Sequence, residues 1–108
     1  MEPFAIRFAE LANRELSDLD TDERESLDFY YASVNLTEGL PADSAPRRWC
    51  TMATTVARLS HMLGGLPRSG DPGVTPQITQ WIEQQRSAHL NSFQRARLRS
   101  FPGGVELV

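Results

Sequence analysis

Arginine side chains in the second half of the chain, together with one glutamine, offer the clearest binding chemistry in this sequence. Gln85 and Arg86 are adjacent, and Arg95 and Arg99 are spaced one helical turn apart. A guanidinium group neutralises phosphates and bonds base edges as a fork, and a glutamine amide can pair with adenine. The candidate nucleic-acid-binding residues are therefore Arg58, Arg68, Gln85, Arg86, Arg95 and Arg99.

The same residues also have a purely structural interpretation. Gln85 can hydrogen-bond a neighbouring loop, and Arg86 can pair with Glu83, three residues earlier on the same helix. Charge runs commonly form a solvated helix face. Nucleic-acid binding instead requires the arginines of the last three expected helices, with Arg47 and Arg48, to gather on one open face.

No arrangement of residues in the sequence indicates catalysis, a metal site or a cofactor. His61 and His89 have no cysteine or carboxylate at metal-ligand spacing, and no nucleophile-elbow motif occurs. The paired carboxylates of the first half lie on an exposed-looking face, where nothing would shift a pKa for acid–base work. We therefore expect a protein that is not an enzyme and that binds no metal or cofactor.

The two halves of the chain carry opposite charge. Residues 1–46 hold eleven acidic residues and three arginines, a net charge of −8. Residues 47–108 hold eight arginines and three acidic residues, a net charge of +5, which gives the total of −3. Such polarity points to binding partners or self-association. All eleven basic residues are arginine, which is also what a GC-rich coding sequence would produce.

The length of 108 residues fits one domain, and 40% apolar residues fit a globular chain. The single cysteine, Cys50, excludes an internal disulfide framework and fits a reducing cytoplasm. Charged residues interrupt any N-terminal signal segment, and no apolar run is long enough to span a bilayer. We expect a soluble, cytoplasmic protein without a membrane partner.

Two helices are expected in the acidic region 1–46. Apolar residues at three- and four-residue spacing predict one over Pro3–Glu15 and another over Asp22–Asn35. Asp20 and Glu23 form a capping-box pattern at the start of the second helix. Glycine, proline and aspartate then predict a loop over Thr37–Pro46. Two helices bury little surface alone, so we expect them to pack against the third.

A third helix is expected from Ser44 or Ala45, with Pro46 in its first turn, to a stop at the glycine pair 64–65. Its apolar seam consists of Trp49, Met52, Val56, Leu59 and Leu63. The tryptophan of this seam, and Trp81 further along, could stack on bases. Both lie on apolar stripes, so we expect them in the core.

A fourth helix should begin at Pro76 behind a Thr75 cap, with its inner face formed by Ile78, Trp81, Ile82 and Gln85. A fifth should begin at Asn91 or Ser92, where Asn91 and Gln94 match a capping box, and end before Pro102. No alternating run predicts a strand. The sequence therefore predicts an all-α fold, a small helical bundle of about five helices.

Several motifs of residues 47–105 occur in a characteristic order. They are Trp49, Gly65-Leu66-Pro67-Arg68, Trp81-Ile82-Glu83-Gln84-Gln85-Arg86, Leu90 to Leu98, and Phe101-Pro102-Gly103. In this order they resemble the helicase-associated domain, a short three-helix module often found in tandem in large bacterial helicase-like proteins. The stretch between Arg86 and Leu90 is shorter than in that family, and Gly104 and Val105 stand where it commonly has an aromatic residue.

The resemblance implies a three-helix module over residues 47–108 that binds nucleic acid, DNA or RNA. The chain has no Walker loop and no lysine to serve one. The resemblance therefore implies an accessory module without ATP hydrolysis. An alternative is a protein-interaction or regulatory module. In that case the acidic helices of residues 1–35, or an uncovered stripe of Phe4, Phe8, Tyr30 and Tyr31, would contact a partner protein or a second copy.

Overall fold

The structure is a computed structural model that describes residues 3–33 and 44–107, apart from the side chains of residues 3–7 and Leu16. Its elements are α1 (Pro3–Ala12), η1 (Leu16–Asp18), α2 (Thr21–Ser33), α3 (Ala45–Leu63), α4 (Pro76–Ser87), α5 (Ser92–Arg99) and η2 (Gly104–Leu107). The two η elements are short 3-10 turns that the sequence did not predict. No strand occurs in these described ranges, so the predicted all-α bundle is confirmed.

The capping signals in the sequence form as predicted. The Asp20 backbone N–H donates to Glu23 Oε1 at 3.1 Å, and the Glu23 N–H donates to Asp20 Oδ1 at 2.7 Å. Thr75 Oγ1 accepts from the N–H of the third residue of α4. Asn91 and Gln94 complete a reciprocal box at the start of α5. These bonds satisfy N–H groups that have no partner within their own helix.

Helix ends agree less closely with the sequence than helix starts. Gly64 ends α3 with a left-handed φ of 78°, as its residue type predicts. By contrast α1 ends at Ala12, three residues before the predicted Glu15. The predicted end of the second helix, at Asn35, lies outside the described residues.

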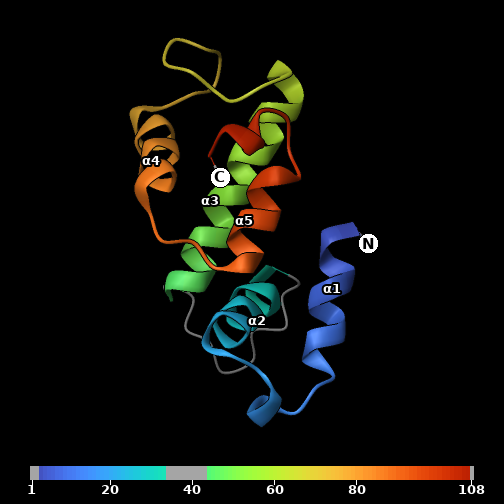
Figure 1. Ribbon diagram of the computed structural model, residues 1–108. Coiled ribbons are helices and arrows are strands. Elements are labelled where there is room, and N and C mark those ends of the chain that lie inside the picture. The colour runs from blue at the N-terminus through green and yellow to red at the C-terminus, as the bar shows by residue number, and fades with distance from the viewer. Residues whose placement is uncertain (1–2, 34–43, 108) are drawn as a thin grey trace.

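The helices pack around one core that both halves of the chain build. α3 is the longest, with α4 on one side, α5 alongside, and α2 across its N-terminal end (Figure 1). Phe8 of α1 meets Phe93 of α5 edge to face, with ring centroids 5.1 Å apart. Tyr30 of α2 stacks on Phe8, and all three rings are buried. The acidic helices therefore complete the core: α2 packs against α3 as expected, whereas α1 packs mainly against α2 and α5.

This packing corrects one expectation about partner binding. Phe8 is 1% exposed and Tyr30 is 6% exposed, because both rings face α5. Tyr31 is half-buried, and the side chain of Phe4 lies outside the described part. The apolar stripe considered as a partner-binding surface is therefore already covered at its centre by the chain itself.

Polar contacts also join α2 to the N-terminus of α5. Asp22 accepts hydrogen bonds from the backbone N–H (3.0 Å) and the hydroxyl of Ser92. Ser26 Oγ accepts from the backbone N–H of Phe93 at 3.2 Å. Together with the Asn91 cap, α2 therefore satisfies the first N–H groups of α5, where negative charge is also favoured by the helix dipole.

The buried face of α3 differs in part from the predicted seam. Trp49 and Val56 are buried as predicted, Met52 and Leu59 are half-buried, and Leu63 is exposed. Small residues occupy much of the remaining buried face: Cys50, Ala53, Ala57 and Ser60. Small side chains let neighbouring helices approach closely, which a search for large apolar residues does not reveal.

Candidate nucleic-acid interface

Gln85, predicted as a site residue, lies in the core. It is 5% exposed, and its Oε1 accepts from the Trp49 indole N–H at 2.9 Å. Its Nε2 donates to the backbone oxygen of Trp81 at 3.0 Å. The two tryptophan rings pack together with centroids 5.6 Å apart, as expected for core residues. Gln85 therefore joins α3 to α4 and is not positioned to contact a nucleotide.

Arg86 and Arg68, two further predicted residues, line one cleft of about 270 Å³. Glu83 and Glu106 line the same cleft, and Arg86 Nε lies 3.0 Å from Glu83 Oε1. The pairing of Arg86 with Glu83, the structural alternative, is thus confirmed. We call this the balanced cleft, because two arginines and two acidic residues line it; Arg68 itself makes no ion pair with a described residue.

The two predicted residues of α5, Arg95 and Arg99, do not line the balanced cleft. Arg95 is partly buried, and its guanidinium donates to the backbone oxygen of Leu90 at 2.7 Å and to Ser92 Oγ at 3.4 Å. It therefore fastens the start of α5. Arg99 is exposed at the other end of the helix. The six predicted residues are thus divided among the core, the balanced cleft and α5, with Arg58 on α3.

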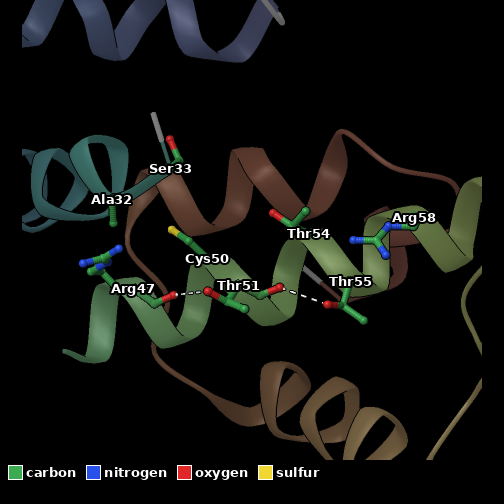
Figure 2. A pocket seen from close by; sticks show the side chains of 8 residues that line it. All are labelled: Ala32, Ser33, Arg47, Cys50, Thr51, Thr54, Thr55 and Arg58. Carbon is green, nitrogen blue, oxygen red and sulfur yellow. Dashed lines mark hydrogen bonds between the residues drawn. The ribbon is translucent and has the colours of Figure 1, made fainter. Parts of the chain in front are cut away.

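Arg58 lies on an exposed face of α3 together with Arg47, at either end of a cleft of about 400 Å³. Figure 2 shows Arg47 beside Ala32 of α2, Arg58 at the far end, and Cys50 and Thr54 between them. At 1.5 Å per residue, the two arginines are separated by roughly 16 Å along the helix axis. Within the described chain neither guanidinium has a hydrogen bond or an ion pair.

A second cleft, of about 560 Å³, lies between α3 and the start of α4. It shares Thr51 and Thr55 with the first cleft and adds Arg48, so the two clefts flank one exposed strip of α3. We call this surface the α3 strip; its residues are Arg47, Arg48, Thr51, Thr54, Thr55 and Arg58. Among the described residues that line the two clefts, none is acidic.

The threonines of the α3 strip differ in their free bonding capacity. The hydroxyls of Thr51 and Thr55 donate to backbone oxygens one turn earlier, at 2.9 and 3.2 Å. Thr54 is exposed, and its hydroxyl makes no hydrogen bond within the described chain. Thr54 can therefore donate to an anion that the arginines attract, whereas the other two hydroxyls hold fixed orientations.

Cys50 forms the floor of the first cleft. Its thiol is 9% exposed and lies 3.4 Å from the backbone oxygen of Phe29. Burial raises the pKa of the Cys50 thiol from 9.0 to about 11, and the positive charge of Arg97 only partly offsets that rise. The thiol is therefore neutral at physiological pH and lacks the character of a nucleophile.

The α3 strip contains Arg47 and Arg48, which the sequence placed only in the wider basic surface, and threonines that the sequence analysis did not single out. Spacings of four, seven and eleven residues from Arg47 put Thr51, Thr54 and Arg58 on one helical face, so the pattern was available. The missing information was which face the neighbouring helices leave open.

Comparison of the chain with protein-family models, curated proteins and solved structures finds no match. No helix in the described ranges is long and apolar enough to cross a membrane. Within those ranges, histidine, cysteine and acidic side chains also do not gather in groups of three that could hold a metal ion.

Proposed function

We propose that this protein is a non-enzymatic module that binds the phosphate backbone of nucleic acid through the α3 strip. One observation carries the proposal: three arginines that make no ion pair with a described residue flank two adjoining clefts, and no acidic residue is among the described residues that line them. A guanidinium that no carboxylate neutralises keeps its full attraction for an anion. The resemblance of residues 47–105 to the helicase-associated domain supports the same function.

The arrangement favours binding to the backbone over reading of bases. Thr54 adds a hydroxyl donor between Arg47 and Arg58, which suits phosphate oxygens. Gln85, the side chain best suited to pair with adenine, is buried beneath Trp49. Binding should therefore show little sequence preference and depend strongly on salt concentration.

The test is a salt titration of a labelled oligonucleotide with two charge-matched double variants. Arg47→Ala with Arg58→Ala removes two charges from the α3 strip, and Arg68→Ala with Arg86→Ala removes two from the balanced cleft. At low salt the first variant should lose about 10- to 30-fold in affinity, with a salt slope shallower by about two. The second should lose less than about threefold, because Arg86 is already paired with Glu83 and a second carboxylate, Glu106, lines the same cleft.

Circular dichroism melting of both variants checks that the fold is intact. Equal losses in the two variants would mean that binding follows net charge and not the α3 strip. Wild-type protein that binds neither DNA nor RNA at low salt would overturn the proposed function altogether.

A further inference from the structure

We infer that the α3 strip takes a single strand of nucleic acid in preference to a duplex. The inference rests on the proposed function and adds the class of ligand. It follows from the position of α3 among its neighbours, from the recessed form of the two clefts, and from the residue types that line them.

The helix that carries the arginines is not free to enter a groove of a duplex. A major groove of about 12 Å admits one α-helix, whose own diameter with side chains is about 10–12 Å. Here α2 lies against the N-terminal half of α3, and the start of α4 lies on its other side (Figure 1). The helix and its two neighbours together are too wide for that groove.

The arginines also line hollows that neighbouring helices help to form. Ala32 and Ser33 of α2 wall the first cleft, and Thr75 and Gln77 of α4 wall the second (Figure 2 shows the first). Phosphates of a single strand can turn individually into such hollows. The phosphates of a duplex are fixed on a stiff convex surface, so fewer of them can enter the two hollows at once.

The lining residues further define how a single strand would bind. No aromatic side chain is among the described lining residues of either cleft, so these residues offer bases no ring to stack on. Attraction therefore comes from phosphates, and single strands of different base composition should bind with similar affinity.

The experiment measures fluorescence anisotropy of a labelled strand of about 12 nucleotides, alone and annealed to its complement, at about 50 and 200 mM salt. We expect the single strand to bind at least about fivefold more tightly at low salt. The Arg47→Ala, Arg58→Ala variant should remove most of that difference, and the Arg68→Ala, Arg86→Ala variant should keep it.

The possible outcomes distinguish a failure of this inference from a failure of the proposed function. A duplex that binds as tightly as the single strand, and weakens equally in the α3-strip variant, overturns the inference and leaves the proposed function standing. No binding of either form overturns both. Strong preference for one homopolymer would contradict the absence of base stacking and would also overturn the backbone mode of binding.

Discussion

The α3 strip and the balanced cleft contain similar residues and offer opposite electrostatics. Each has at least two arginines and at least one threonine within a concave surface. In the balanced cleft, Glu83 and Glu106 stand among the arginines, and Arg86 is already bonded to the first of them. Along the α3 strip, no acidic residue is found among the residues that the structure describes in the lining of either cleft. An anion therefore gains more from the α3 strip.

The difference shows why net charge along a segment does not locate a binding surface. Residues 47–108 carry a charge of +5, and only three acidic residues offset their arginines. Two of those three line the balanced cleft. The positions of a few carboxylates determine which surface attracts an anion. Those positions depend on how η2 and α4 approach each other.

The largest expected effect is the pH dependence of stability that Cys50, beneath the α3 strip, contributes. Because the folded protein raises the pKa of Cys50 to about 11, the unfolded chain loses its thiol proton first as pH rises. Stability from this group is complete below pH 9 and declines between pH 9 and 11. The shift corresponds to about 2–3 kcal/mol of unfolding free energy.

Denaturant unfolding at pH 8 and pH 11 measures this decline, with Cys50→Ala as the control. The chain contains no lysine, so few other groups titrate in this interval, and both proteins share them. An equal decline in the control would mean that the thiol is not held neutral beneath the strip.

A second prediction separates the core role of Gln85 from any binding role. Gln85→Ala leaves the Trp49 indole N–H buried without its acceptor and opens space between α3 and α4. We expect a loss of about 2 kcal/mol in unfolding free energy. Oligonucleotide affinity of the folded variant should stay within about twofold of the wild type.

The matched control is Gln84→Ala, one residue earlier on α4, where the side chain is exposed. That change should alter stability by less than about 0.5 kcal/mol. If Gln85→Ala weakened binding without lowering stability, the side chain would belong to the interface and not to the core.

Local signals in the sequence were sufficient for most of the fold. Proline, threonine, asparagine and the capping boxes fix the starts of helices through contacts only three residues long, so Pro76 and Asn91 mark their helices correctly. The exposed Leu63 and the buried Ser60 were not predictable in this way. Their burial depends on which side of α3 meets its neighbours, which is a property of the tertiary packing.

The candidate site was harder to predict for the same reason. The pairing of Arg86 with Glu83 was available from their spacing on one helix, and it is observed. That Arg58 makes no ion pair with a described residue and lines an open cleft depends on which helices pack beside α3, and the sequence does not give this. Arg95 likewise turns back to the carbonyl of Leu90, a contact that depends on the path of the loop before α5.

The smallest expected effect comes from a variant whose balanced cleft, like the α3 strip, has arginines but no carboxylates. Glu83→Gln with Glu106→Gln removes both carboxylates from the balanced cleft while keeping the size of their side chains. Arg86 then loses its ion pair with Glu83, and no carboxylate remains among the described residues that line the cleft, so the cleft should gain affinity for a single strand. Because both carboxylates are exposed and such ion pairs are weak, we expect a gain of only about two- to fourfold at low salt.

Anisotropy titration of this variant provides the measurement, and Glu25→Gln with Asp28→Asn on exposed positions of α2 is the matched control for net charge. A gain confined to the balanced-cleft variant would establish that its carboxylates, and not the type or number of its arginines, keep that cleft from binding. An equal gain in the control would instead assign the effect to the field of the whole molecule. In that case the contrast between the two surfaces would not explain where the strand binds.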